Sequence, residues 1–229
     1  MDHECLKRQA AAAAVAEIAD GMVLGLGTGS TAALMITRLG ERISREGLRV
    51  RGIPTSERTA EAALAAGVPL TDFARDPVID LAIDGADQIT RAGLDLIKGL
   101  GGALLREKIV ADAARRLVIM ADASKLVETL AGVVPIEVVP FGWEATARKI
   151  EALAGAPRLR RAADGAPYRS DGGNLILDCD FGAVADPAPL DDALRRLVGV
   201  VETGFFLGRA DLVLLADENG VKRLERRQP

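Results

Sequence analysis

The sequence contains a single histidine, His3, which lies almost at its beginning. This scarcity excludes Ser-His-Asp and Cys-His catalytic arrangements and an ordinary histidine-rich zinc site. The two cysteines, Cys5 and Cys179, lie far apart and have the spacing of neither a metal site nor a redox motif. If the protein is an enzyme, we therefore expect carboxylates and lysines to move the protons, without a metal ion.

Aromatic residues and clustered basic charge are scarce as well. Aromatics make up 3% of the chain, and the formal net charge is -4. A nucleic-acid partner would need stacking side chains and a basic surface, and an anionic membrane would need the second of these. The acidic first residues, 1–4, lack signal-peptide flanks, and no apolar run reaches the length of about 18 that spans a bilayer. We predict a cytoplasmic protein that binds a small molecule, with no nucleic acid and no membrane as partner.

Apolar runs alternate with helical patterns through the first part of the chain. Strands followed by helices favour a mainly parallel sheet that is covered on both faces. The predicted helices are 5–19, 32–39, 56–66 and one that ends at 116, and the predicted strands are 22–26, 48–53, 78–83 and 117–121.

The order changes near residue 135, where the pattern becomes strand, helix, two strands, helix, strand. This is the ferredoxin-like order. Its predicted strands are 136–139, 158–162, 174–180 and 200–206, and its helices are 144–153 and 190–197. A final strand over 210–216 returns to the first sheet. The predicted fold class is α/β, with a Rossmann-like mainly parallel sheet domain (1–130 plus 207–229) and an inserted ferredoxin-like α+β domain (131–206).

A glycine-rich turn, Gly27-Thr28-Gly29-Ser30-Thr31, stands between a predicted strand and a predicted helix. Glycines let the backbone approach an anion, and the helix N-terminus offers unpaired N–H groups. The alternative is a tight turn with a capping hydroxyl. The turn has no Walker lysine and lacks the G-x-G-x-x-G spacing, which disfavours a dinucleotide site. We interpret it as a phosphate-binding turn.

Two further segments carry charged side chains where a strand ends. Asp84-Gly85-Ala86-Asp87 follows a buried strand, and ligands of open α/β sheets gather at that edge. Its two carboxylates suit neighbouring sugar hydroxyls, and the alternative is an Asx turn with a helix cap. Lys98 opens a second glycine-rich turn, where a lysine stabilises an oxyanion. The alternative for Lys98 is a solvated side chain.

Glu107 lies on the helical face that carries Ala103, Leu104 and Val110. Partial burial there would raise the pKa of Glu107 toward the range of a general base, and Lys98 would lower it. Leu105 and Ile109 occupy the other side of the same helix, so the pattern leaves its buried face open. Lys125 follows a predicted strand, and it either binds a substrate oxygen or belongs to a surface turn.

These segments, in this order and with this spacing, resemble the ribose-5-phosphate isomerase A family over nearly the whole chain. Each motif is weak by itself, but the ordered set is specific. The matching segments are 25–31, 84–87, 98–104, 106–109, 121–125, 135–140, 171–174 and 199–204.

The resemblance implies a cofactor-free aldose–ketose isomerase of the pentose phosphate pathway, acting on D-ribose 5-phosphate and D-ribulose 5-phosphate through an enediolate. It implies Glu107 as general base, Lys98 as the residue that stabilises the enediolate, and Asp84 and Asp87 as contacts of the sugar hydroxyls. It also implies a homodimer or homotetramer. The implied substrate contacts are Lys7, a looser match, with Thr28, Gly29, Ser30, Thr31, Asp84, Gly85, Ala86, Asp87, Lys98, Gly99, Leu100, Gly101 and Lys125.

Two departures from the family pattern leave the catalytic groups in place. Gln88 stands where an acidic residue often follows the two aspartates, and Leu100 interrupts a run that is often all glycine. Two rival functions are a non-catalytic sugar-phosphate sensor and a sugar-phosphate deaminase or CoA-transferase-like enzyme. The sensor would need a DNA-reading module, and the deaminase expects a histidine near its site.

Overall fold

The computed structural model describes residues 2–226. Contacts within the chain divide it into two compact units. The first unit takes the residues up to 86, then 106–126 and those from 208 onward, and the second takes 87–105 and 127–207. The predicted domain boundary put 87–105 with the first unit. These residues group with the second because two of their short strands pair there, and the domain assignment itself stays a prediction.

The first unit is built on a six-stranded sheet in the order β14-β13-β6-β3-β1-β2. All neighbours are parallel except β14, an edge strand that runs antiparallel to β13. The strands are β1 (Val23–Leu26), β2 (Arg51–Pro54), β3 (Leu81–Gly85), β6 (Leu117–Asp122), β13 (Leu212–Asp217) and β14 (Gly220–Glu225). The predicted parallel sheet, including its late returning strand, is confirmed.

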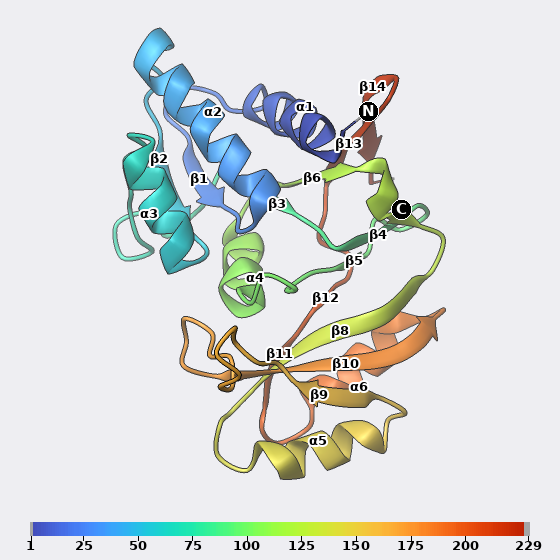
Figure 1. Ribbon diagram of the computed structural model, residues 1–229. Helices are drawn as coiled ribbons and strands as arrows, with labels where there is room; N and C mark the ends of the chain where they lie inside the picture. Colours follow the sequence, from blue (N-terminus) through green and yellow to red (C-terminus); the bar gives the residue numbers. More distant parts are fainter. Residues whose placement is uncertain (1, 227–229) are drawn as a thin grey trace. The chain divides into compact units, whose positions relative to one another are not determined.

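Helices cover both faces of this sheet. They are α1 (His3–Val15), α2 (Ser30–Glu46), α3 (Glu57–Ala65) and α4 (Leu104–Ala113), with a short 3₁₀ helix, η1 (Ala123–Lys125). Helices α1 and α2 lie side by side over one face (Figure 1), where Leu24 and Leu26 of β1 join their core. Gly25 faces the other way and meets Val110 of α4. The alternation along one strand thus assigns α4 to the opposite face.

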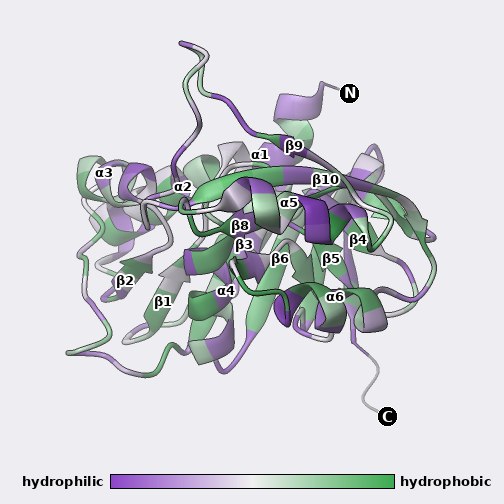
Figure 2. Cartoon of the chain, turned by 90° about the horizontal axis from the view of Figure 1, so that it is seen from below, coloured by the Kyte–Doolittle hydropathy of each residue, from purple (hydrophilic) through white to green (hydrophobic). Residues whose placement is uncertain are grey.

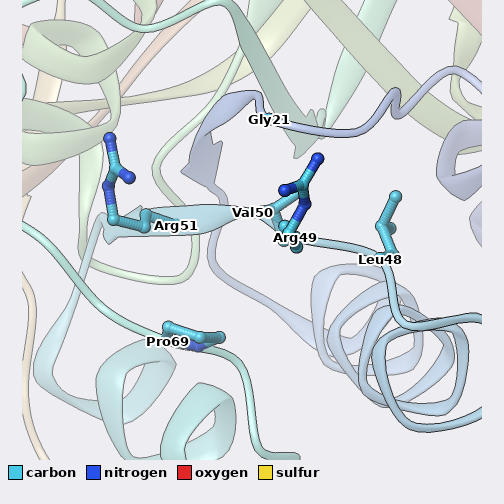
Figure 3. A pocket seen from close by; sticks show the side chains of 6 residues that line it. All are labelled: Gly21, Leu48, Arg49, Val50, Arg51 and Pro69. Atoms are coloured by element: carbon cyan, nitrogen blue, oxygen red, sulfur yellow. The ribbon is translucent and has the colours of Figure 1, made fainter.

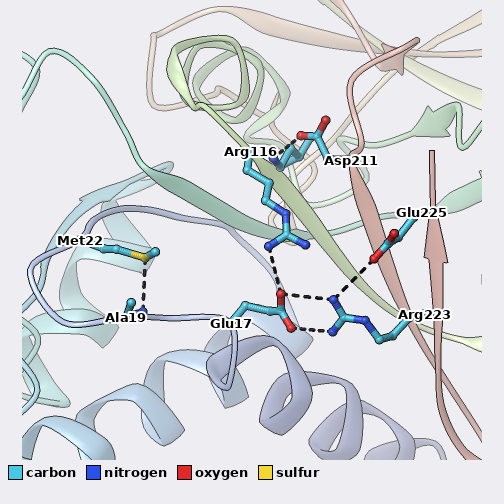
Figure 4. A network of polar contacts seen from close by, with 8 residues as sticks. Glu17, Ala19, Met22, Arg116, Asp211, Arg223 and Glu225 are labelled. Atoms are coloured by element: carbon cyan, nitrogen blue, oxygen red, sulfur yellow. Dashed lines mark hydrogen bonds and ion pairs between the residues drawn. The ribbon is translucent and has the colours of Figure 1, made fainter. Parts of the chain in front are cut away.

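An ion-pair network holds the segment after α1 against the sheet (Figure 4). Glu17 accepts hydrogen bonds from Arg116, at 3.0 Å, and from Arg223 of β14, at 2.6 Å. The hydrogen bond from Arg223 is the main cause that lowers the pKa of Glu17, against the opposing effect of burial. The network joins three parts of the first unit that are distant in sequence.

The second unit contains the predicted ferredoxin-like arrangement, which is confirmed. Its four-stranded antiparallel sheet has the order β11-β8-β10-β9. Helix α6 alternates hydrophilic and hydrophobic residues along its length (Figure 2), and its buried Leu194 packs against the sheet. The elements are β8 (Leu130–Val138), α5 (Trp143–Glu151), β9 (Ala156–Leu159), β10 (Leu175–Val184), α6 (Pro187–Arg195) and β11 (Val200–Thr203).

A second small sheet was not predicted. It has the order β12-β5-β4-β7, with β4 (Gln88–Thr90), β5 (Leu96–Ile97), β7 (Leu126–Val127) and β12 (Phe205–Phe206). The single strand predicted over 200–206 is therefore wrong. It divides at Gly204, whose N–H donates to the carbonyl of Pro135 while its own carbonyl accepts from Lys98 N–H. A Cβ at Gly204 would lie 2.5 Å from the Lys98 carbonyl oxygen, so only glycine fits.

None of the helices within residues 2–226 combines the length and the apolar character that crossing a bilayer requires.

Candidate active site

The first glycine-rich turn lies at the carboxyl edge of the parallel sheet. Strand β1 lies between β2 and β3. The connection from β1 leads to β2 on one side, and the connection from β2 leads back to β3 on the other side of β1. This reversal of strand order opens a ligand crevice at the carboxyl ends of the strands. Gly27 N–H donates to the carbonyl of Ile83 at 2.9 Å, and Thr28 N–H donates to Asp84 Oδ1 at 3.1 Å. The buried Asp84 carboxylate is therefore fixed against this turn.

The hydroxyl of Thr28 points into the protein. Its Oγ1 lies 2.7 Å from Thr55 Oγ1, 2.9 Å from Ser56 Oγ and 2.9 Å from Thr59 Oγ1. All four residues are buried. Thr55 also donates to the carbonyl of Leu26. We call these four side chains the hydroxyl cluster.

The sequence interpretation did not predict the hydroxyl cluster. Ser56 is also the N-cap of α3, where its Oγ accepts from Thr59 N–H at 3.0 Å. The hydroxyl of Thr28, predicted as a substrate donor, is engaged within this cluster. The signal in the sequence was the run of hydroxyl residues that follows a strand, Thr55-Ser56 with Thr59 one helical turn later.

The rest of the turn runs into the N-terminus of α2. Gly29, with φ of 118°, is the N-cap, and no side chain caps the helix. Lys7 of α1 reaches this point, where its Nζ donates to Ser30 Oγ at 3.0 Å. A cation beside an uncapped helix N-terminus favours an anion. The structure thus brings Lys7, the looser sequence match, to the predicted phosphate turn, and Thr31 follows in the first turn of α2.

Glu107 is buried in α4, with 4% of its surface exposed. Ile109 is 48% exposed, so the buried face is the one that carries Glu107, Leu104 and Val110. Val110 lies against Gly25 in the middle of β1. Because α4 ends near the amino end of β3, where the carbonyl of Ala113 accepts from Ile79 N–H, Glu107 lies one helical turn nearer the edge that carries Gly27 and Asp84.

Lys125 ends η1, just after the carboxyl end of β6. Its side chain is half-buried. The pKa of Asp122 is lowered: burial, the largest single influence, raises it, but the hydrogen bonds from Ser124 and then the charge of Lys125 outweigh burial. Gly85 ends β3 and Ala86 follows it, and Gly85 N–H donates to Asp84 Oδ1 at 2.7 Å. The first unit therefore carries most of the predicted site residues near one edge of one sheet.

The second unit carries Asp87 and the Lys98–Gly102 turn. Asp87 Oδ2 accepts from Leu100 N–H at 3.0 Å. Lys98 is buried, its Nζ lies 5.3 Å from the centre of the Phe206 ring, and its backbone N–H donates to Gly204 at 2.9 Å. The predicted alternative for Lys98, a solvated side chain, is wrong. Leu100 is 52% exposed at the tip of the turn.

Sequence interpretation also missed Arg160. Its Nη1 donates to the carbonyls of Gly99 and Leu100, each at 3.0 Å, and its Nε donates to Asp178 at 2.9 Å. No local pattern marks this arginine, because it contacts residues about sixty positions away in the chain.

A hollow of about 540 Å³ lies at the other edge of the parallel sheet (Figure 3). It is lined by Gly21, Leu48, Arg49, Val50, Arg51 and Pro69. Both arginines are engaged in ion pairs, Arg49 with Asp20 and Arg51 with Asp76. Ligands of parallel sheets gather at the carboxyl ends of the strands, so this hollow at the amino ends does not compete with the candidate site.

Comparison with known proteins shows which family the chain resembles. The sequence profile of ribose 5-phosphate isomerase A (phosphoriboisomerase A) matches residues 51–220. The chain belongs to the ribose-5-phosphate isomerase A family. It is 55% identical to the ribose-5-phosphate isomerase A of Gloeobacter violaceus over 226 residues, which cover 98% of this chain and 97% of that one.

Solved structures of ribose-5-phosphate isomerases share the whole fold. The ribose 5-phosphate isomerase A of Methanocaldococcus jannaschii matches with a TM-score of 0.94 and 39% identity, covering 98% of this chain and 100% of that one. A D-ribose-5-phosphate isomerase in complex with phospho-erythronic acid matches with a TM-score of 0.95 and 38% identity, covering 99% and 100%. The predicted family and fold class are thus confirmed.

Proposed function

We propose that Glu107 is the general base with which this aldose–ketose isomerase interconverts D-ribose 5-phosphate and D-ribulose 5-phosphate. Membership of the ribose-5-phosphate isomerase A family gives the reaction. The assignment of residues follows from the chemistry that the reaction needs, since a hydrogen must move between two neighbouring carbons of a sugar phosphate.

The phosphate group binds where Lys7 meets the N-terminus of α2. The contact from Lys7 Nζ to Ser30 Oγ, 3.0 Å long, supports this assignment, as does the absence of a side-chain cap on α2. The N–H groups of the first helical turn, which includes Thr31, donate to the phosphate oxygens, and Lys7 supplies the countercharge. Thr28 contributes its backbone, because its hydroxyl belongs to the hydroxyl cluster. Lys125 is a further substrate contact.

The proton transfer belongs to Glu107. The substrate opens to its aldehyde, and Glu107 removes the proton from C2 while the C1 carbonyl oxygen takes up the electron pair. The product of this step is an enediolate. Glu107 then returns the proton to C1, the hydroxyl proton of the C2 oxygen passes to the C1 oxygen, and the C2 oxygen becomes the ketone. No electrons leave the sugar, so no redox cofactor is required.

Charged neighbours of the reacting atoms complete the assignment. Lys98 stabilises the negative charge that develops on the enediolate oxygen, because a buried cation is most effective where water is excluded. Asp84 and Asp87 accept hydrogen bonds from the sugar hydroxyls and assist ring opening. The proposed substrate contacts include the backbone of the turns at 85–86 and 99–101. The D-ribose-5-phosphate isomerase of similar fold was solved with phospho-erythronic acid, whose planar carboxylate resembles an enediolate in shape.

The observation that carries the proposal is the burial of Glu107 on the face of α4 that packs on the sheet. The test is Glu107→Gln, which keeps the shape of the side chain and removes its basicity. We expect kcat for ribulose 5-phosphate formation to fall by about 10²-fold or more, the scale of general-base catalysis, while the substrate still binds.

The matched control is Glu61→Gln on the exposed surface of α3, which we expect to keep the parent activity. Exchange of the substrate C2 hydrogen with solvent deuterium, followed by NMR, gives a second measurement. Near-parent exchange in Glu107→Gln would show that another group is the base.

We also propose that the enzyme works in the cytoplasm, without a cofactor or metal ion, as a homodimer or homotetramer. The net charge of -4 disfavours nucleic acid and anionic membranes as partners, and the family supports a small sugar phosphate as substrate. Sedimentation equilibrium at micromolar concentration distinguishes the two assemblies, and a monomer at that concentration would refute both. Activity that disappears on treatment with a chelator and returns with a divalent ion would refute the metal-free assignment.

A further inference from the structure

We propose that Arg160 is a positioning residue for this isomerase, because its guanidinium orients two peptide groups of the Lys98–Gly102 turn. The inference rests on the proposed function, since it acts through the turn of Lys98 and through Asp87. All the contacts that carry it lie within the second unit.

Arg160 is enclosed by partners on two sides. Its Nη1 donates to the carbonyls of Gly99 and Leu100, each at 3.0 Å. Its Nε and Nη2 donate to the two carboxylate oxygens of Asp178 on β10. The Tyr168 ring lies 5.9 Å from the guanidinium carbon, and only 13% of the arginine side chain is exposed.

The two carbonyl contacts determine where the corresponding N–H groups point. In a trans peptide the C=O and N–H of one plane point in opposite directions. The Gly99 carbonyl faces Arg160, so the Leu100 N–H faces away, and there it donates to Asp87 Oδ2 at 3.0 Å. The Leu100 carbonyl also faces Arg160, which turns the Gly101 N–H away from the guanidinium. Arg160 therefore determines the direction of a donor to a proposed catalytic carboxylate.

Packing alone does not hold this turn. Leu100 is 52% exposed, and its neighbour Gly101 is exposed as well. Gly99 and Gly102 have φ of 98° and 85°, a region that few residues favour. Arg160 and Tyr168 belong to one hairpin, residues 160–168, in which Arg161 and Pro167 form an antiparallel bridge. A Cβ at Gly102 would lie 2.2 Å from the Tyr168 hydroxyl, so this hairpin also encloses the end of the turn. The hydrogen bonds from Arg160 therefore hold the turn in place of hydrophobic packing.

An arginine is needed because the guanidinium is a planar fork with five donors. It binds a carboxylate with one edge and two carbonyls with the other. A lysine ammonium is a point donor on a flexible stem, and it keeps the charge beside Asp178 without holding both peptides.

The test compares Arg160→Ala and Arg160→Lys with Arg161→Ala as control. Arg161 is the next residue in the chain, and its Nη1 donates to Gly165 in the exposed end of the hairpin. With ribose 5-phosphate as substrate, we expect kcat of Arg160→Ala to fall by about 10- to 100-fold, the scale of a misplaced catalytic group. KM should change much less, and Arg161→Ala should keep both constants.

Added guanidinium ion, at concentrations far below those that denature, provides a measurement that lost stability does not explain. We expect it to restore part of kcat in Arg160→Ala and to leave Arg161→Ala unchanged. If Arg160→Ala does not fold, Arg160→Lys replaces it, with an expected loss of kcat at near-parent melting temperature.

Either of two results would overturn the inference: a folded Arg160 variant with parent kcat, or a loss of kcat that follows the melting temperature and that guanidinium does not rescue. A parent enzyme without activity on ribose 5-phosphate would instead refute the proposed function. The two failures are therefore distinct.

Discussion

Gly27–Thr31 and Lys98–Gly102 are both glycine-rich turns that lead into a helix, but different chemistry holds each of them. The first is held by the hydroxyl cluster around Thr28, which contains no charge and is buried. The second is held by Arg160, whose charge is matched by Asp178. Neutral hydroxyls suit the buried start of the first turn, Gly27 and Thr28, because burying them costs less than burying an ion. A turn with an exposed tip lacks such a core, and a guanidinium reaches it from a neighbouring hairpin.

The largest effect is expected at Gly27, where the Gly27–Thr31 turn lies directly against Asp84 of β3. A Cβ on Gly27 would lie 2.1 Å from Asp84 Oδ1 and 2.6 Å from the Asp84 Cα. The Cα is backbone and cannot rotate away, so Gly27→Ala must displace the turn or β3. We expect kcat/KM to fall by about 10²-fold or more in steady-state assays.

The matched control for Gly27→Ala is Gly21→Ala, which lies before β1 at its other end. Gly21 has φ of 84°, and no atom lies within 4 Å of the position that a Cβ would occupy there. This variant should lose about 1 kcal/mol of unfolding free energy through backbone strain and keep its kinetic constants. Equal kinetic losses in both variants would contradict the close-approach argument.

The next effect concerns the hydroxyl cluster. Thr28→Val keeps the shape of the side chain and removes the oxygen that contacts three others. We expect the free energy of unfolding, measured with urea, to fall by about 1–3 kcal/mol, because buried hydroxyls lose a partner. Thr37→Val on α2, whose hydroxyl is exposed and bonds only to the carbonyl of Ala33, is the control. A stability loss no larger than that of the control would mean that the cluster does not hold the turn.

A smaller loss is expected from removing the proposed phosphate contact, Lys7, which does not belong to the hydroxyl cluster. Lys7→Met removes the cation beside Ser30, and we expect KM for ribose 5-phosphate to rise by about tenfold, or about 1.4 kcal/mol, with little change in kcat. Arg8→Met is the control, because Arg8 pairs with Glu4 on the exposed side of α1. Unchanged KM in Lys7→Met would place the phosphate elsewhere.

The smallest effect concerns the ion pairs of Glu17 with Arg116 and Arg223, which lie away from the carboxyl ends of the strands. They serve as a reference because we expect them to affect stability and not catalysis. The folded-state pKa of Glu17 is lowered, so its stabilising contribution is complete above the unfolded pKa and is lost as pH falls through the folded value. Glu17→Gln should cost about 0.5–1 kcal/mol at pH 7, because both arginine partners are partly exposed and solvent screens the pairs.

The stability difference between Glu17→Gln and the parent should shrink as pH falls below about 4. Thermal melts across pH measure it, with Glu46→Gln, an exposed partner of Arg42, as control. Kinetic constants that change with Glu17→Gln would mean that the two edges of the sheet are coupled.

Local patterns predicted the parts of the molecule that local residues determine. The turn at Gly27 and the carboxylate Asp84 follow buried strands, and their edge follows from a parallel sheet. The buried face of α4 stayed open in the sequence, because Ile109 and Val110 both fit an apolar stripe. The contact of Val110 with Gly25, which is distant in the chain, decides it.

Other features had no local signal. Strands of two or three residues, such as β4 and β7, are too short for a periodic pattern, and β14 is a polar edge strand. Arg160 resembles any other arginine until the fold brings it to Gly99. These features depend on long-range pairing, which a single sequence does not reveal. The site residues themselves stay proposals until the variants above are measured.

The division of one extended segment at Gly204 has a consequence for how this chain tolerates insertions. Thr203 pairs with β8 and Phe205 pairs with β5, with one residue between them. Inserting a single amino acid there would turn the side chains of Phe205 and Phe206 each to the face of the small sheet opposite to the one it now occupies, since side chains alternate along a strand. The length of this crossing is therefore fixed, whereas the exposed turn between β13 and β14 has room to vary.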